Sequence, residues 1–285
     1  MTRATGERLC AVGHVTLDAS PDGPRPGGSV TFASRVWRAF GAAPRVVTAA
    51  GPDFPVAAVD GLIRWQPSAV TTRFLNTYDA VGGRAQRLLA LAPPVRPTSM
   101  SPLDALFLAP VLGEVEPRAW LQVPARLRAA GLQGWLKRSV DGVVRHGPDA
   151  VQPALFAGLD LAFLSDEDLA GDDSWLARLR GVVPCVVLTQ GAAGCTVFAA
   201  GRATQVRAGP ARAIDPTGAG DTFAAAFILA RVRGLDLRAC AVVAHRAAAA
   251  AIGWPGVPPM AAFGGTTVGL AHALAPAACE RYPFP

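Results

Sequence analysis

The segment with the clearest chemical potential covers residues 215–223 and reads DPTGAGDTF. Its small residues Gly218, Ala219 and Gly220 let successive backbone N–H groups point into one space, where an apolar stretch with helical character begins. Such an arrangement binds an anion. Asp221 falls in the first turn of the expected helix, beside that anion site.

A carboxylate beside an anion site has a specific use. The backbone N–H groups stabilise charge that develops on a phosphoryl group in transfer, and the carboxylate accepts the proton of an attacking hydroxyl. The plainer interpretation is that Asp221 caps an ordinary helix after a glycine turn. We favour the catalytic interpretation, because the segment joins the small residues and the carboxylate at adjacent positions.

Other patterns that carry chemistry are missing from the sequence. Lys137 is the only lysine, so no phosphate loop of the form G-x-x-x-x-G-K-S/T exists. The five cysteines are scattered without a C-x-x-C pair, which argues against a disulfide framework or a structural zinc site. The four histidines show no metal-ligand spacing, and we interpret them as structural or incidental.

Composition narrows the class of protein. The chain has 285 residues, 51% of them hydrophobic and 17% charged, which suffices for a large core. The net charge is +6, but no basic run or basic–aromatic stripe indicates nucleic-acid binding. The richest apolar stretch, residues 239–254, is shorter than the roughly 20 residues of a membrane span, and the N-terminus lacks an apolar signal core. We therefore expect a cytoplasmic protein with neither a nucleic-acid nor a membrane partner.

The elements around the motif predict an α/β fold. Residues 9–15 form a short apolar run, 29–40 have helical spacing that ends at Gly41, and 45–50 form another apolar run. Residues 18–28 are rich in proline and glycine and read as a loop. Strand, loop, helix and strand in this order are the opening of an α/β fold.

A different pattern follows at residues 71–78 and 84–91. Their partly alternating polarity, with Gly82 and Gly83 between them, predicts a small antiparallel appendage. Beyond it, the α/β pattern returns. We expect strands over 106–108, 159–164 and 182–189, a hairpin over 195–199 and 204–207, and helices over 117–130, 166–180, 220–233 and 237–252.

Residues 215–221 resemble the D-T-x-G-A-G-D signature of the ribokinase-like, or PfkB-type, carbohydrate kinases, with Pro216 and Thr217 in a variant order. Other segments resemble further motifs of that family in the same chain order. Residues 13–18 resemble its G-x-x-x-x-D opening, Gly27 and Gly28 its glycine pair, and residues 189–194 its T-x-G-x-x-G motif.

This resemblance implies a fold and an assembly. The implied fold is a ribokinase-like three-layer α/β/α sandwich with a mostly parallel central sheet and a small β lid. Residues 1–285 would form a single domain, with lid segments near 14–30 and 70–92. Dimerisation through the lid would cover an open sheet edge.

The resemblance also implies an ATP-dependent kinase that phosphorylates a hydroxyl of a small sugar or polyol, with Mg²⁺ and, by the same analogy, K⁺. Asp221 would be the general base, and Gly218, Ala219 and Gly220 would form the anion hole. The expected acceptor-binding residues are Asp18, Gly27, Gly28, Phe32, Asn76, Arg84 and Gln133. The expected nucleotide-side residues are Ser165, Asp168, Thr189, Gly191, Gly194, Thr217 and His245. Asp168 would organise Mg²⁺ through water, and Asp215 would order the anion-hole loop through a monovalent cation.

Two departures from the family pattern bear on activity. The family usually has asparagine where this chain has Phe32, which implies either that one contact to a sugar hydroxyl is lost or that the substrate is unusual. Its N-x-x-E motif reads Ser165, Asp166, Glu167 and Asp168 here, which gives the last carboxylate a shorter arm. The plainer interpretation of this acidic group is a helix N-terminus.

Three segments, 27–32, 71–78 and 133–138, are similar to the myo-inositol kinase-like branch of the family. On that basis Asn76, Arg84 and Gln133 would bind polyol hydroxyls, although lid or surface roles fit them equally. A nucleoside kinase is the alternative enzyme, with Phe32, Phe74 and Tyr78 as stacking surfaces for a base. A non-catalytic ligand-binding relative is the alternative outside catalysis.

Overall fold

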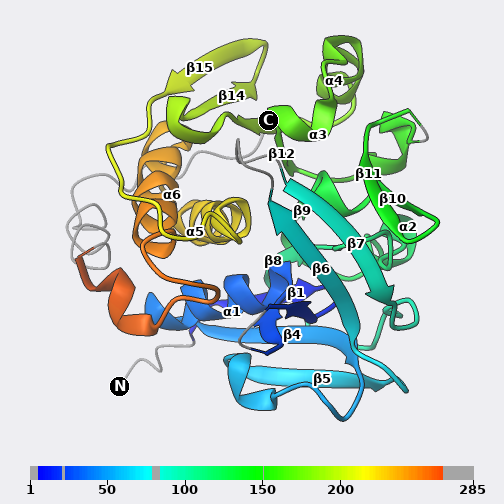
Figure 1. The fold of residues 1–285 in the computed structure, drawn as a ribbon. Coiled ribbons are helices and arrows are strands. Elements are labelled where there is room, and N and C mark those ends of the chain that lie inside the picture. Colours follow the sequence, from blue (N-terminus) through cyan, green and yellow to red (C-terminus); the bar gives the residue numbers. More distant parts are fainter. Residues whose placement is uncertain (1–5, 21–22, 79–83, 150, 266–285) are drawn as a thin grey trace.

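Two β-sheets organise the part of the chain that the computed structural model describes, which is residues 6–20, 23–78, 84–149 and 151–265 (Figure 1). The larger sheet has the strand order β15-β14-β13-β12-β9-β8-β1-β4-β5. All its neighbouring strands are parallel except β13 with β14 and β14 with β15. Its strands are β1 (Arg8–Val12), β4 (Ala43–Ala50), β5 (Leu62–Pro67), β8 (Leu103–Leu108), β9 (Ala125–Gly131), β12 (Leu161–Ser165), β13 (Cys185–Thr189), β14 (Cys195–Ala199) and β15 (Arg202–Val206).

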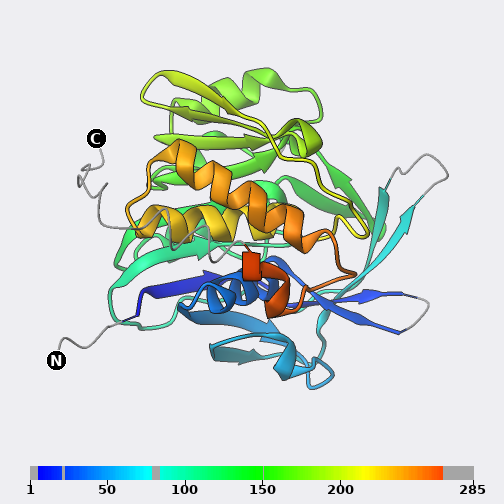
Figure 2. The ribbon, with the colours of Figure 1, turned by 90° about the vertical axis from the view of Figure 1, so that its left-hand side faces the viewer.

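Both faces of this sheet are covered, as the apolar character of its central strands requires. In β1, Leu9 and Ala11 belong to one core, and Cys10 and Val12 belong to the other. The helices are α1 (Ser29–Ala39), α2 (Pro117–Trp120), α3 (Asp166–Leu169), α4 (Asp173–Arg180), α5 (Ala219–Val232) and α6 (Leu237–Ala251). Helices α1, α5 and α6 pack on the first face (Figure 2), and residues of α2, α3 and α4 belong to the second core. The predicted three-layer α/β/α arrangement is confirmed.

The second sheet has the strand order β10-β11-β7-β6-β2-β3. Its neighbours are antiparallel, except that β2 pairs with β6 in parallel. Its strands are β2 (Thr16–Ala19), β3 (Arg25–Gly27), β6 (Thr72–Tyr78), β7 (Arg84–Ala90), β10 (Lys137–Val140) and β11 (Val143–His146). The hairpin predicted at 71–91 is β6 and β7, and residues expected to be loop between 18 and 28 contribute to β2 and β3.

Two predicted helices are wrong in extent. The helix expected over 117–130 stops at Trp120, and Ala125–Gly131 is strand β9 between β8 and β12. Pro124 lies between the two elements, and a proline cannot sit inside a helix without removing a hydrogen bond. The helix expected over 166–180 is α3 and α4, because Ala170 and Gly171 both adopt positive φ angles.

Short 3₁₀ turns complete the described fold. They are η1 (Val56–Ala58), η2 (Leu132–Gly134), η3 (Pro153–Phe156), η4 (Gly191–Ala193) and η5 (Met260–Phe263). In the described ranges, no helix has both the length and the apolarity to cross a membrane. Cysteines 10, 185, 195 and 240 are buried and unpaired, and Cys279 lies outside the described residues. Burial raises the pKa of Cys10 to about 12, which leaves its thiol protonated at neutral pH.

Candidate active site

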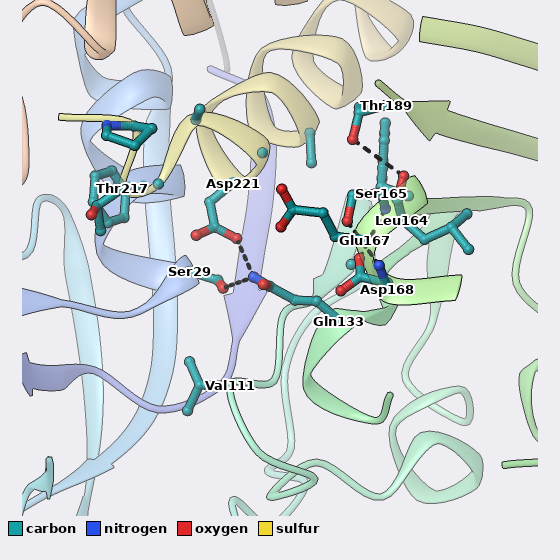
Figure 3. Close-up of a pocket in the computed structure, with 18 of the residues that line it drawn as sticks. Ser29, Val111, Gln133, Leu164, Ser165, Glu167, Asp168, Thr189, Thr217 and Asp221 are labelled. Carbon is teal, nitrogen blue, oxygen red and sulfur yellow. Dashed lines mark hydrogen bonds between the residues drawn. The ribbon is translucent and has the colours of Figure 1, made fainter. Parts of the chain in front are cut away.

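A cavity of about 430 Å³ lies where the larger sheet meets the second sheet (Figure 3). Its walls include the last residues of three parallel strands, Gly131 of β9, Ser165 of β12 and Thr189 of β13. The carboxyl ends of parallel strands are where α/β proteins bind their ligands. Residues of β2, β6, β7 and β10 close the cavity from the second sheet. Its volume suits a small molecule.

The predicted anion site is on this cavity. Gly218 caps α5 in the left-handed conformation, with φ of 75°, and no side chain caps the helix. Gly218, Ala219 and Gly220 all line the cavity, so the N-terminus of α5 faces it. The partial positive charge of an uncapped helix N-terminus favours an anion there.

Asp215 anchors the loop that leads into α5. Its Oδ1 accepts a hydrogen bond from the backbone N–H of Thr217 at 2.9 Å, and its Oδ2 accepts one from Gly256 at 2.9 Å. Burial raises the pKa of Asp215, but these hydrogen bonds outweigh the burial and leave the pKa below its ordinary value. The carboxylate thus orders the loop through backbone donors.

Phe32 supports the anion site from below. The residue belongs to α1 and is 2% exposed. A Cβ added to Gly218 would overlap the Cε1 atom of the Phe32 ring. Phe32 was expected to bind the acceptor; it does line the cavity, but its ring packs under the turn that precedes α5.

Asp221 is held by a side chain far away in the sequence. Nε2 of Gln133 donates to Oδ1 of Asp221 at 3.1 Å and to the hydroxyl of Ser29 at 3.4 Å (Figure 3). Nζ of Lys137 donates to Oε1 of Gln133 at 3.1 Å. The fold therefore brings Gln133, predicted to be an acceptor-binding residue, onto the predicted base.

Asp18 and Gly28 also line the cavity, and Gly27, the last residue of β3, precedes Gly28. Asp18 is in β2 and lines the cavity, and the hydroxyl of Thr16 donates to its Oδ1 at 3.4 Å. At Gly27, a Cβ would come within 2.8 Å of the Thr16 hydroxyl oxygen. At Gly28, a Cβ would overlap the backbone carbonyl of His14, and φ is 89°. Both glycines thus permit the close passage of β3 past β2 next to Asp18.

Ser165 and Asp168 form a capping box at the start of α3. The Ser165 hydroxyl accepts from the Asp168 N–H, and Oδ2 of Asp168 accepts from the Ser165 N–H at 2.8 Å. Asp168 is 5% exposed, and Nδ1 of His146 lies 3.7 Å from its Oδ1. Burial raises the pKa of Asp168, but hydrogen bonds from His146 and Ser165 and the charge of Lys137 outweigh it and lower the pKa.

Glu167 differs from its neighbour. It is exposed, lines the cavity, and directs its carboxylate into the cavity on the side of Asp221 (Figure 3). Sequence reasoning misses both Glu167 and Lys137. The signals were present, since Glu167 lies in the acidic turn after β12 and Lys137 is the only lysine.

The structure places only part of the predicted nucleotide-side motif, residues 189–194, on the cavity wall. Thr189 ends β13 and donates to the carbonyl of Leu164 at 3.3 Å, and Gly191 begins η4 with φ of 53°. Thr189, Gly191 and Thr217 all line the cavity. Gly194 does not line it; a Cβ there would overlap the carbonyl of Val206, so this glycine permits the approach of β14 to the end of β15.

Asn76 and His245 are absent from the described lining of this cavity. Asn76 in β6 accepts a hydrogen bond from Nε2 of Gln86 at 2.9 Å, and it is Gln86 that lines the cavity. Arg84 begins β7, but its side chain is outside the described part of the structure. His245 lies in α6 with its ring against Phe223, on a second cavity of about 590 Å³. That cavity also has two arginines on its wall, Arg207 and Arg246.

The charges of the first cavity are unbalanced. Its described lining contains five carboxylates and one cation, Lys137. The carboxylates are Asp18, Asp166, Glu167, Asp168 and Asp221. A phosphorylated ligand in this cavity would therefore need cationic compensation beyond Lys137.

Comparisons with known proteins agree with this architecture. Residues 137–260 match the pfkB family carbohydrate kinases. An inositol 3-kinase of Oryza sativa subsp. japonica is 31% identical over 257 residues, which are 81% of this chain and 64% of the rice protein. An inositol 3-kinase of Zea mays is 39% identical over 74 residues, which are 26% of this chain and 20% of the maize protein. The chain thus spans less than two thirds of the length of either relative.

Solved structures show the same fold. A pyrophosphate-dependent kinase in the ribokinase family has a TM-score of 0.76 at 19% identity, over 90% of this chain and 99% of that one. A pyrophosphate-dependent kinase complexed with a pyrophosphate analog and myo-inositol scores 0.75 at 19% identity, with the same coverage. Arabidopsis thaliana ribokinase, complexed with ribose and ATP, scores 0.66 at 16% identity, over 93% of this chain and 99% of that one.

The chain has the fold of the ribokinase-like α/β proteins, and the predicted anion site lies at the start of α5. The sequence matches point further, because they connect the same chain to one family. Residues 137–260 are similar to the pfkB family carbohydrate kinases, and the relatives found by sequence are inositol 3-kinases.

Proposed function

We propose that the protein transfers the terminal phosphoryl group of ATP to a hydroxyl of a small polyol or sugar, with myo-inositol as the first acceptor to test. One observation carries the proposal. Asp221 lies in the first turn of α5, beside an uncapped helix N-terminus, on a cavity at the carboxyl ends of parallel strands. A carboxylate and an anion site in one cavity are the two groups that this transfer needs.

In the proposed reaction, Asp221 accepts the proton of the acceptor hydroxyl while the oxygen of that hydroxyl forms a bond to the γ-phosphorus of ATP. The bond from the γ-phosphorus to the bridging oxygen breaks, and ADP leaves. The backbone of Gly218, Ala219 and Gly220 stabilises charge on the phosphoryl oxygens. Asp18, also on the cavity wall, orients the acceptor, which raises the effective concentration of its hydroxyl.

The residues present fit Mg²⁺, which the family implies. Among the described residues, no group of three or more His, Cys, Asp or Glu side chains could enclose a metal ion. Mg²⁺ needs no such group, since one or two carboxylates, donor phosphates and water usually hold it. Glu167 reaches into the cavity, and Asp168 lines it. When bound, the ion would neutralise the donor phosphates, which the acidic lining otherwise repels.

Pyrophosphate is the alternative donor, because structurally similar kinases depend on it. The structurally similar Arabidopsis thaliana ribokinase was solved with ATP, and the motif at Thr189 and Gly191 favours a nucleotide. ATP is therefore the expected donor, and pyrophosphate is the one to compare with it.

A polyol acceptor is favoured over a nucleoside by two of the three aromatic residues predicted to stack on a base. Base stacking needs an exposed ring face. Phe32 is 2% exposed beneath Gly218, and Phe74 is 3% exposed in a small core with Val111 and Val144. The side chain of Tyr78 lies outside the described part of the structure. A non-catalytic role is disfavoured, since such a protein has no need to hold Asp221 with Gln133 beside an anion site.

The test is donor consumption with myo-inositol, ribose, fructose, 2-keto-3-deoxygluconate, adenosine and cytidine, each with ATP or pyrophosphate, with Mg²⁺, and with or without K⁺. Asp221→Asn should lower turnover on the true acceptor by roughly a hundredfold or more while donor binding persists. Asp236→Asn is the matched control, because Asp236 caps α6 and is absent from the cavity lining. Full turnover in Asp221→Asn would refute the role of Asp221.

A further inference from the structure

Lys137 lies at the start of β10, on the cavity wall, and reaches Asp221 through a third side chain. Its Nζ donates to Oε1 of Gln133 at 3.1 Å, and Nε2 of Gln133 donates to Oδ1 of Asp221 at 3.1 Å. Gln133 belongs to the turn between β9 and β10, and Asp221 to α5. The fold itself therefore connects the only lysine of the chain to the proposed base.

The two ends of this chain of hydrogen bonds demand the same orientation of the Gln133 amide. An ammonium group only donates, so it requires the amide oxygen, and a carboxylate only accepts, so it requires the amide NH₂. The reversed amide would direct its NH₂ at the Lys137 ammonium and its oxygen at Asp221. Both contacts would then be repulsive, so Lys137 adds to Asp221 in excluding the reversed orientation.

We propose that Lys137 is a positioning residue for phosphoryl transfer, which fixes the Gln133 amide so that its NH₂ holds and orients the Asp221 carboxylate. This inference rests on the proposed function of Asp221. It gives Gln133 a role in orienting the base in place of binding a polyol hydroxyl.

The surroundings of Asp221 make such a donor valuable. The other charged groups of the described lining are the carboxylates Asp18, Asp166, Glu167 and Asp168, together with Lys137. Without Lys137, the Gln133 amide would lose the contact that its oxygen makes while its NH₂ group holds Asp221. A hydrogen bond between a neutral donor and a charged acceptor is one of the stronger types in proteins, so its loss is measurable.

Steady-state kinetics test the proposal. Lys137→Met removes the cation, and we expect kcat to fall roughly tenfold or more, while KM for donor and for acceptor stays nearly unchanged. Lys137→Arg keeps a donating cation and should restore most of kcat. Arg138→Met is the matched control, because Arg138 is the next residue, is exposed, and pairs with Asp149 at 3.7 Å.

A double-mutant cycle separates positioning from direct phosphate binding. If Lys137 acts through Gln133, the Lys137→Met change should have no further effect on kcat in a Gln133→Leu background. If Lys137 instead binds the donor phosphates, KM for the donor rises in Lys137→Met and the two changes add. That second result would overturn the proposal.

A readout without turnover keeps the two proposals apart. The side-chain NH₂ resonance of Gln133, assigned by its loss in Gln133→Leu, should move in Asp221→Asn and in Lys137→Met and stay in place in Arg138→Met. If it moves but no acceptor is phosphorylated, the proposed function fails while the contact stands. If the enzyme turns over and the Gln133 resonance does not shift in Lys137→Met, the proposed positioning role of Lys137 fails.

Discussion

The ring of Phe32 packs against Gly218, and its Cε1, Cζ and Cδ1 atoms lie within 2.5 Å of the position that a Cβ of residue 218 would take. Gly218 also has φ of 75°, which side chains with a Cβ rarely adopt. Two independent constraints therefore require glycine at the position that begins α5. They connect the aromatic residue of α1 to the geometry of the anion site.

Gly218→Ala should lower the free energy of unfolding by about 2–4 kcal/mol, from the left-handed backbone and the overlap with Phe32 together. Turnover should fall roughly tenfold or more, because the backbone donors move. Gly220→Ala is the control for stability. Residue 220 lies in α5, and its Cβ would meet no atom within 4 Å, so alanine should keep or raise stability. Urea denaturation measures the free energy of unfolding of both variants. An equal loss of stability in Gly218→Ala and Gly220→Ala would contradict this account.

The sequence alone predicts both the anion site and the proposed base, because these residues are adjacent in the chain. It also shows that Phe32 departs from the family pattern, but not what the ring does. That function depends on α1 packing against α5, which brings together residues 32 and 218. Gln133 and Asp221 are likewise 88 positions apart, and no local pattern connects them.

The two acidic residues of α3 should separate into different roles. Glu167→Gln should raise the Mg²⁺ concentration for half-maximal rate several-fold with little change in stability, since Glu167 is exposed on the cavity. Asp168→Asn should instead lower stability by about 1–3 kcal/mol, because the capping box and the contact with His146 both use its carboxylate. For each variant, the rate measured against Mg²⁺ concentration gives the Mg²⁺ requirement, and thermal unfolding gives the stability. If Asp168→Asn changed only the Mg²⁺ requirement and left stability intact, Asp168 and not Glu167 would be the residue that serves Mg²⁺.

Asp215 predicts a pH dependence. Its folded pKa lies below the ordinary value of 3.8, so its stabilising contribution is complete above pH 3.8 and is lost as the pH falls through the lower, folded pKa. Asp215→Asn, which replaces one acceptor oxygen by an NH₂ group, should be less stable than wild type at about pH 7. The difference should shrink towards about pH 2. Urea denaturation at both pH values checks this, and a difference that is independent of pH would exclude the carboxylate as its source.

Local signals explain most of the fold that the sequence predicts and several of its errors. The buried parallel strand at Cys185–Thr189 and helices α5 and α6 follow directly from apolar patterning. The hairpin of β10 and β11 was missed, although Asp141 and Gly142 both adopt positive φ between the strands, as an Asp-Gly turn requires. Strand β9 was mistaken for helix because its alanines suit either structure, and only the pairing with β8 and β12 decides.

Glu114 should prove a structural anchor between the two sheets. Its Oε1 accepts from the backbone N–H of His14 at 2.8 Å, and its Oε2 accepts from Leu112 at 2.8 Å. Val111, on the cavity wall, donates to both oxygens. Glu114 is only 4% exposed, so water cannot readily replace a lost acceptor.

Glu114→Gln sets an amide NH₂ against at least one of these backbone donors, and we expect it to lower the free energy of unfolding by about 1–3 kcal/mol. Glu116→Gln is a close control, because Glu116 also accepts two backbone N–H groups, as the cap of α2, but is exposed to water. Glu116→Gln should lower the free energy of unfolding by at most about 1 kcal/mol. Since His14 joins β1 to β2, the Glu114 variant should also raise KM for the acceptor, as Asp18 moves with β2. Loss of stability with an unchanged KM would limit Glu114 to folding and separate it from the geometry of the cavity.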